Sequence, residues 1–258
     1  MIPTMQLASA TADVLGLALE YPAGAETSHV HEQFGQIMYI VRGAATVQTE
    51  QGCWVLPPQR ALWIPAGVRH AFSHARPVSL RTVYVRRGCA GMPDWRQCTV
   101  IHVAALLREL MLALMDMPWN YASDSHADRI GKVLLDSLAA AEQDALDLRT
   151  PNDPRAARAA LIARGDPAHT LPLSEIAHRA GASERTLNRL FIAETSMGFG
   201  AWRRCLRLTH ALESLAYGEP VATVAAAIGY ENPSSFIAAF KSVFGTTPAK
   251  YFSSSTSR

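Results

Sequence analysis

Residues 173–191 read LSEIAHRAGASERTLNRLF, and residues 221–240 read VATVAAAIGYENPSSFIAAF. The stretches match at a constant offset of 48 from Ile176 to Gly181, after which the second has one inserted residue. In each, apolar residues at i, i+3, i+4 and i+7 predict an amphipathic helix, and a glycine supplies a sharp turn into a second helix. This repeated helix-turn-helix pattern predicts a domain that presents two helices to successive major grooves of double-stranded DNA.

The outward faces of the two second helices hold the candidate DNA contacts. Ser183 and Asn232 are typical N-caps, and Pro233 suits a first helical position. Arginine suits guanine edges or phosphates and asparagine suits adenine, whereas the uncharged second face favours readout of thymine methyl groups and DNA shape. The predicted contacts are Glu184, Arg185, Asn188 and Arg189 in the first repeat, Arg203 and Arg207 between the repeats, and Ser234, Ser235, Ile237, Ala238 and Lys241 in the second. For the arginines, an ordinary solvated or structural charge is the alternative.

Residues 154–252 resemble the DNA-binding domain of AraC/XylS-family transcription regulators. The resemblance rests on the two repeats, a connecting helix expected at 200–217, and the closing run FKSVFGTTPAKY at 240–251. Ser196 stands where the family often has glycine, and Ala238 stands where many members have a contacting arginine. The resemblance implies promoter or operator DNA as partner, RNA polymerase as a further candidate partner, and weaker direct readout by the second repeat.

The distribution of charge agrees with this division of the chain. The whole chain has 24 basic and 22 acidic residues; after Asp153 it has 12 basic and 7 acidic residues, so that part carries net +5 and the preceding part net −3. The basic surface expected of a DNA-binding domain therefore lies in the helix-turn-helix part. The four cysteines lack CxxC spacing, and neither a signal peptide nor a membrane-length apolar run is evident, which predicts a cytoplasmic protein with reduced thiols.

The first hundred residues predict a β domain. Short β-forming runs at 36–41, 45–49, 61–64 and 79–86 alternate with turn residues, which is typical of a β-sandwich or jelly roll. The order of the polar residues resembles the two cupin motifs, HxH followed by glutamate and glycine, and then PxGxxH. The matching residues are Gly24, His29, His31, Gln36 in the glutamate position, Gly43, Pro65, Gly67 and His70.

The cupin resemblance implies a metal site inside a small barrel. His29 and His31 are two residues apart, so both rings point to the same face of a strand, and His70 closes a set of three imidazoles. Imidazoles suit Zn, Ni, Cu or Fe, and Gln36 supplies no negative charge, which weakens the site. The predicted metal ligands are His29, His31, Gln36 and His70, with Trp54 and Trp63 as ligand-binding residues of the pocket. The alternatives are a metal-free pocket for a small ligand and simple core packing of the tryptophans.

The sequence between these two domains is expected to form helices. Val103, Leu107, Leu110, Leu114 and Met117 form a short heptad-like seam, which suits either dimerisation or packing against the barrel. A second amphipathic run covers 126–146, and a proline-containing turn follows at 149–154. We therefore predict a two-domain α+β fold: a cupin-like jelly-roll barrel at 1–98, a helical linker at 99–150, and an all-α domain with two helix-turn-helix units at 151–258.

The combined pattern predicts a DNA-binding transcription regulator, expected to be a homodimer, whose DNA affinity responds to a metal or small-molecule effector. The segments GCWVLPP at 52–58 and ALWIP at 61–65 complete a resemblance to regulators of neighbouring efflux-transporter genes. The alternative is a metal-dependent cupin enzyme, such as a dioxygenase, fused to a DNA-binding module. We expect the protein not to be an enzyme, because no carboxylate that could act as a general acid or base accompanies the histidines at a convincing spacing.

Overall fold

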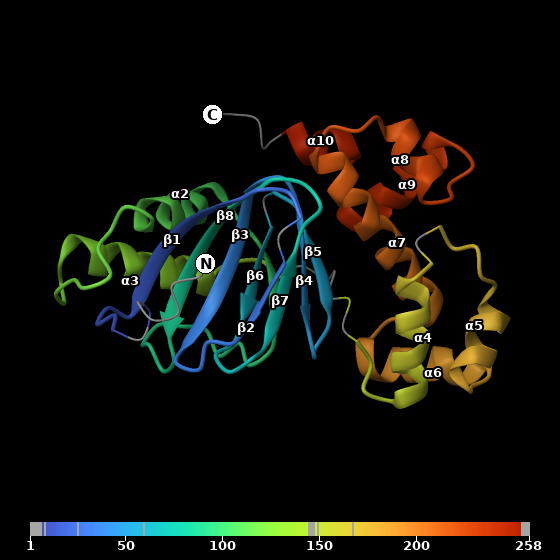
Figure 1. The fold of residues 1–258 in the computed structure, drawn as a ribbon, viewed down its shortest axis with the longest axis horizontal. Helices are drawn as coiled ribbons and strands as arrows, with labels where there is room; N and C mark the ends of the chain where they lie inside the picture. Colours follow the sequence, from blue (N-terminus) through green and yellow to red (C-terminus); the bar gives the residue numbers. More distant parts are fainter. Residues whose placement is uncertain are drawn as a thin grey trace. The chain divides into compact units, whose positions relative to one another are not determined.

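The computed structural model describes residues 7, 9–24, 26–58, 60–143, 148, 150–166 and 168–253. The chain divides into an N-terminal unit, within residues 1–50 and 56–145, and a C-terminal unit, within 51–55 and 146–258. Figure 1 shows the strands and helices of each unit. The two-domain α+β fold predicted from the sequence is confirmed. The predicted boundaries between the sensor domain, the linker and the DNA-binding domain stay a prediction.

Two antiparallel sheets form the β domain, one with strand order β1-β8-β3-β6-β9 and the other with order β2-β7-β4-β5. The rings of Tyr21 on β1 and Phe72 on β7 lie 5.3 Å apart, so side chains of the two sheets meet between them. The strand bounds are β1 Val14–Tyr21, β2 Glu26–His29, β3 Phe34–Arg42, β4 Ala45–Thr49, β5 Cys53–Leu56, β6 Arg60–Ile64, β7 His70–Ser73, β8 Val78–Arg86 and β9 Thr99–His102.

The outer face of the five-stranded sheet is covered by helices α2 (Ala105–Leu114) and α3 (His126–Ala139). Leu107 and Leu114 of the predicted seam are buried in one cluster with Ile37 and Val83 of the sheet. The structure therefore favours packing of this seam against the sheet, and dimerisation stays a prediction. The run predicted as helical to residue 146 ends earlier, since α3 ends at Ala139; residues 144–147 lie outside the described residues.

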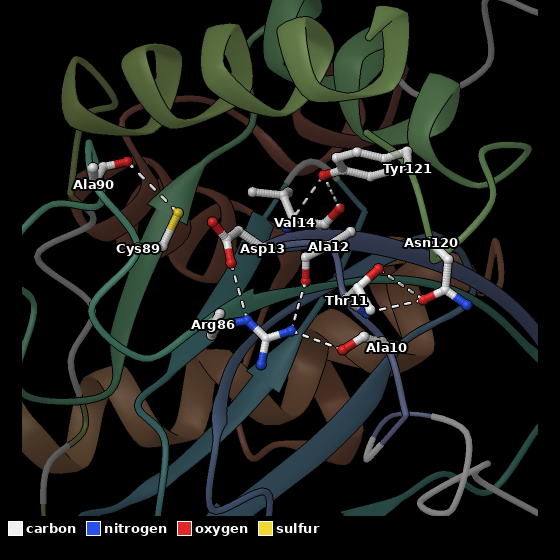
Figure 2. A network of polar contacts seen from close by, with 10 residues as sticks. All are labelled: Ala10, Thr11, Ala12, Asp13, Val14, Arg86, Cys89, Ala90, Asn120 and Tyr121. Carbon is white, nitrogen blue, oxygen red and sulfur yellow. Dashed lines mark hydrogen bonds and ion pairs between the residues drawn. The ribbon is translucent and has the colours of Figure 1, made fainter. Parts of the chain in front are cut away.

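A polar network ties the segment before β1 to the rest of the N-terminal unit (Figure 2). The Arg86 guanidinium donates to the carbonyl oxygens of Ala10 and Ala12 at 2.9 and 3.0 Å and pairs with the Asp13 carboxylate at 2.9 Å. Ala10 and Ala12 are buried in one cluster with Tyr84, whose ring lies on the inner face of the five-stranded sheet. This segment therefore shields the space around Tyr84 from water.

The C-terminal unit is helical. Helices α5 and α6 form the first helix-turn-helix, α8 and α9 form the second, and α7 connects them (Figure 1). One hydrophobic cluster surrounds Phe191 and Trp202 and the other surrounds Phe236 and Phe240, and α7 contributes to both. The helix bounds are α4 Pro154–Arg164, α5 Leu173–Ala180, α6 Glu184–Thr195, α7 Phe199–Ala216, α8 Val221–Ala227, α9 Pro233–Phe244 and α10 Pro248–Ser253.

The predicted turn and caps of the repeats are confirmed. Gly181 ends α5 in the left-handed region, with φ of 74°. The Ser183 hydroxyl accepts from the Thr186 amide at 3.1 Å, and the Asn232 side-chain oxygen accepts from the Ser235 amide at 2.9 Å. These bonds satisfy amide groups at the start of α6 and α9 that no helical carbonyl can reach.

Candidate histidine cluster and DNA-binding surface

Three histidines converge inside the N-terminal unit. His29, the last residue of β2, pairs across the sheet with His70, the first residue of β7, and their ring centroids are 4.2 Å apart. The His31 ring lies 4.7 Å from His29 and 5.8 Å from His70. One ring nitrogen from each histidine lies within 4.8 Å of the other two. The structure thus brings together the three imidazoles that the two motifs predicted.

A backbone hydrogen bond explains the glycine of the second motif. The Gly67 amide donates to the His31 carbonyl oxygen at 2.9 Å, and Gly67 has φ of +85°. A residue with a side chain would be strained in that conformation. Gly67 therefore allows the turn before His70 to bond directly to the backbone of His31, two residues after the end of β2.

The three rings are neutral at neutral pH. Burial, with repulsion from the neighbouring imidazoles, lowers the pKa of His29 to about 3 and that of His31 to about 4. Burial also lowers the pKa of His70. At 3.1 Å from the Val68 carbonyl oxygen, Nδ1 of neutral His70 is the donor, which leaves the Nε2 lone pair free. A carbonyl that orients the ring in this way is typical of histidines that bind metals.

The ring nitrogens that face the cluster have no hydrogen-bond partner in the described part of the chain. Nε2 of His29, His31 and His70 is buried in each case and unpaired. Buried polar atoms are nearly always paired, because an unpaired one costs about 1–3 kcal/mol. Three such imidazoles, with ring nitrogens within 4.8 Å of one another, are therefore suited to a bound cation, which all three lone pairs can satisfy at once.

Gln36 borders this cluster from the inner face of β3. It is 2% exposed, and its Nε2 donates to the Thr82 hydroxyl at 2.9 Å, which in turn donates to the Ile37 carbonyl oxygen at 3.1 Å. Interaction with Gln36 opposes the lowering of the His29 pKa, which places the amide beside that ring. The Gln36 Oε1 atom is buried and unpaired among the described residues, so it is available as a neutral oxygen ligand.

Tyr84 and Thr27 also belong to this inner space, although sequence reasoning missed both. The Tyr84 ring is fully buried and lies 5.0 Å from the His31 ring, in an edge-to-face arrangement. Its hydroxyl and that of Thr27, two residues before His29 on β2, are buried and unpaired among the described residues. The sequence did contain a signal for Tyr84, because side chains alternate along the β-forming run 79–86 and this alternation puts Thr82 and Tyr84 on the same face.

The two tryptophans predicted to line the pocket are buried in other settings. Trp63 belongs to the cluster on the outer face of the sheet, and its Nε1 donates to the Trp95 carbonyl oxygen at 2.9 Å. Successive strand residues point to opposite faces, so Trp63 points away from the histidines, and the structure favours the core-packing alternative. Trp54 is 2% exposed in the short segment grouped with the C-terminal unit, and its part in a pocket stays a prediction.

Helix α6 presents an exposed polar face. Leu187, Leu190 and Phe191 are buried, whereas all four predicted contacts on this helix, Glu184, Arg185, Asn188 and Arg189, are exposed. Asn188 has a structural task as well, because its side-chain oxygen accepts from the Phe199 amide at 3.2 Å, at the start of α7. The guanidinium groups of Arg185 and Arg189 are thus the charged groups most free to meet a ligand on this face.

Arg203, predicted as a phosphate contact, is buried inside the C-terminal unit. It is 9% exposed, and its Nη2 donates to the Asp166 carboxylate and to the Leu171 carbonyl oxygen, both at 2.7 Å. Burial would raise the pKa of Asp166, but hydrogen bonds from Thr170, Leu171 and Arg203 outweigh it and lower that pKa to about 2. The structure therefore favours the structural alternative for Arg203.

Arg207 is also engaged within the C-terminal unit. Its Nε donates to the Ile228 carbonyl oxygen, and its guanidinium lies 3.9 Å from the centroid of the Tyr230 ring. These contacts favour a structural charge that joins α7 to the end of α8. Arg204, between the two, is exposed and is the α7 arginine best placed for a phosphate contact.

Helix α9 presents an outward face that differs from that of α6. Phe236, Phe240 and Phe244 are buried, and Ile237 is half-buried. The exposed residues among the predicted contacts are Ser234, Ser235, Ala238 and Lys241. A single cation and two hydroxyls lie along this face, compared with two arginines on α6, and this difference matches the weaker direct readout expected of the second repeat.

Comparison with known proteins matches the two halves of the chain to two family models. The AraC-like ligand-binding domain matches residues 11–139, and a helix-turn-helix domain matches residues 176–254. The HTH-type transcriptional regulator NimR of Escherichia coli K12 is 32% identical over 226 residues, which cover 87% of this chain and 82% of NimR. RipA of Corynebacterium diphtheriae is 35% identical over 105 residues, which cover 41% of this chain and 31% of RipA.

Solved structures were compared as well. A crystal structure of unsaturated fatty acid-bound ToxT from Vibrio cholerae has 12% identity and a TM-score of 0.39, over 95% of this chain and 96% of that chain. In the described part of this chain, none of the helices combines the length and the apolarity needed to span a membrane.

NimR and RipA are transcriptional regulators, which favours the regulator over the enzyme alternative. The chain belongs to the AraC family of helix-turn-helix transcriptional regulators and carries an N-terminal AraC-like ligand-binding domain.

Proposed function

We propose that this regulator reads DNA chiefly through α6 and positions itself with α9. The exposed Arg185 and Arg189 would contact guanine edges and phosphates, with Glu184 and Asn188 at the flanks of the same face. Ser234, Ser235, Ile237, Ala238 and Lys241 would meet the second major groove mainly through shape, methyl contacts and phosphate contacts. The two arginines and the free face of α6 support this assignment.

We propose further that the N-terminal unit senses a divalent transition metal, with Zn, Ni, Cu or Fe as candidates. The observation that supports this most directly is the convergence of three neutral imidazoles, two buried and one half-buried, whose ring nitrogens lie within 4.8 Å of one another and include an unpaired one on each ring. His29, His31 and His70 would be the ligands, with the Gln36 oxygen as a weaker fourth ligand. A metal bound there would change DNA affinity only as far as it binds the DNA-competent state more tightly than the other states.

We expect the DNA-binding form to be a homodimer in the cytoplasm. Leu106 on α2 is 62% exposed and Val133 on α3 is 45% exposed, and both lie on the helix layer outside the sheet. Large exposed apolar side chains of this kind suit a contact between copies. Light scattering of the purified full chain, with a Leu106→Asp variant for comparison, tests this: a dimer that the variant separates is expected, and a monomeric wild-type chain would contradict it.

The proposed function is tested by measuring metal content and DNA binding on the same samples. Elemental mass spectrometry of the untagged full chain is expected to find close to one metal ion per chain, and His31→Ala is expected to lose it. A matched control is His178→Ala, an exposed histidine on α5. Operator fragments selected from a random DNA library would then be titrated with metal-loaded and chelator-treated protein, with a different affinity expected.

Each part of the proposal has its own contrary result. Metal absent from both wild type and variant would overturn the metal site and leave DNA binding intact. Selected DNA whose affinity is unchanged by Arg189→Ala would overturn the α6 assignment. Equal DNA affinity with and without metal would leave a metal site but overturn its role in control.

A further inference from the structure

No buried acidic side chain accompanies the histidine cluster among the residues that the structure describes, and the carboxylate of Glu32, the residue after His31, is exposed. The buried polar residues of the N-terminal unit are His31, Gln36, His70, His74, Ser79 and Thr82, none of them acidic. A divalent ion held by three neutral imidazoles and one amide would keep its full double charge in a buried site.

An uncompensated buried charge of that size is costly. Isolated ions in low-dielectric surroundings cost several kcal/mol or more unless they are paired. Gln36 is the position at which the resembling motif has glutamate, so this chain lacks the one carboxylate that would supply part of the balance. A ligand that brings its own negative charge would therefore bind better here than a neutral one.

Two residues that adjoin the cluster, Tyr84 and Thr27, have buried hydroxyl groups without a partner among the described residues. The Tyr84 ring touches the His31 ring, and the Tyr84 hydroxyl is fully buried without a partner among the described residues. Thr27 lies on the same face of β2 as His29, and its hydroxyl is also buried and unpaired. A phenol hydroxyl carries its proton at neutral pH, so that of Tyr84 can act as a donor. A cation and two donors together require an acceptor, which an anionic oxygen supplies.

We propose that the effector of this regulator is a small carboxylic acid, whose carboxylate binds the metal at its open position and accepts hydrogen bonds from Tyr84 and Thr27. This inference rests on the metal site proposed above. It assigns Gln36 a role in specificity: a neutral amide at this position leaves both charges of the ion for the effector to balance, whereas a glutamate would balance one of them and weaken the binding of an anionic effector. Water ionised on the metal is the competing source of an anionic oxygen.

Cobalt-loaded full chain provides the test, because Co²⁺ bound by imidazoles absorbs visible light in a way that depends on its ligands. Acetate is the probe, and acetamide, which has a similar size and no charge, is the control molecule. We expect acetate to change the spectrum saturably and acetamide to have no effect. Tyr84→Phe should weaken acetate binding about tenfold or more, the effect of losing one hydrogen bond to a charged group.

Two further variants sharpen the test. Tyr39→Phe, on the outer face of β3, removes a tyrosine hydroxyl elsewhere in the same sheet and should bind acetate like the wild type. Gln36→Glu should hold cobalt at least as tightly but bind acetate more weakly than the wild type. Retained cobalt affinity with weakened acetate binding would distinguish a specificity role from general damage to the fold.

The contrary results separate this inference from the one on which it depends. Cobalt bound at one ion per chain, with no spectral response to acetate or with equal acetate affinity in Tyr84→Phe and wild type, would overturn the carboxylate effector alone. A spectrum that changes with pH but not with acetate would identify metal-bound hydroxide as the balancing anion and would also overturn it. Failure of the chain to bind cobalt would overturn both, while selected-DNA binding by the same samples would show that the regulator itself is intact.

Discussion

Two clusters of buried polar groups, one in each unit of this regulator, differ in how they are paired. In the C-terminal unit, the buried Asp166 carboxylate accepts hydrogen bonds from Thr170, Leu171 and Arg203, so its negative charge is satisfied within the chain. In the N-terminal unit, the nitrogens of the histidine cluster and the oxygens near them have no partner among the described residues. Because unpaired buried polar groups are costly, the first arrangement serves structure and the second suits a ligand from outside the chain.

The largest effect should come from breaking the satisfied cluster. Arg203→Ala leaves the Asp166 carboxylate buried with one fewer donor, and we expect it to lower the free energy of unfolding of the C-terminal unit by about 3–5 kcal/mol. Urea unfolding followed by circular dichroism measures this. The control is Arg204→Ala, an exposed neighbour on α7, expected to change stability by no more than about 0.5 kcal/mol. If both variants lost a similar free energy of unfolding, the ion pair between Arg203 and Asp166 would not be important for stability.

Filling the unsatisfied cluster should have the next largest effect. Zinc at a hundred times its dissociation constant should stabilise the N-terminal unit by about 2.7 kcal/mol, since binding to the folded state alone shifts the equilibrium. Thermal unfolding with and without zinc measures the gain, which His70→Ala should lose. His74→Ala is the matched control, because His74 is buried near the same strand but lies outside the cluster. A zinc response that survives in His70→Ala would place the ion elsewhere.

The pH dependence of the satisfied cluster follows from Asp166. Its pKa is about 2 in the folded protein against 3.8 for a free side chain, so the unfolded state binds more protons between these values. The stabilisation is fully present above about pH 4 and is lost as the pH falls through 2, with a total of about 2 kcal/mol. A carbon-13 NMR titration of the Asp166 carboxyl measures its pKa directly. A midpoint near 4 would show that the hydrogen bonds do not outweigh burial.

The contrast between units also shows what the sequence could predict. The helices, turns and caps of both repeats followed from spacings of three and four residues and from local turn chemistry, and the histidine cluster followed from two short motifs. The roles of Arg203 and Trp63 could not be predicted in this way. Arg203 meets Asp166, which is 37 positions away in the sequence, and the face of the sheet that Trp63 occupies depends on where α2 and α3 pack. The periodicity of residues along a helix or strand predicts which side chains share a face. Tertiary packing then decides what each face is buried against.

A smaller difference separates the two repeats on the DNA side. Arg189→Ala removes a charge from the exposed face of α6 and should weaken binding to selected DNA by about 1–3 kcal/mol while relaxing one base preference. Lys241→Ala on α9 should weaken binding more evenly across sequences and reduce the salt dependence by about one phosphate contact. Fluorescence anisotropy with matched and altered DNA at several salt concentrations measures both effects. Equal loss of base preference in the two variants would show that the repeats read DNA alike.

The smallest expected effect concerns the end of α6. Ser196 has φ of 59°, in the left-handed region where a side chain is strained, and it stands where the family often has glycine. Ser196→Gly should therefore raise the free energy of unfolding of the C-terminal unit by about 0.5–1 kcal/mol. Ala193→Gly, an exposed position inside the same helix, should lower it by a similar amount, because there glycine only adds freedom to the unfolded chain. Opposite signs at positions three residues apart would show that backbone conformation, and not loss of a side chain, sets the effect.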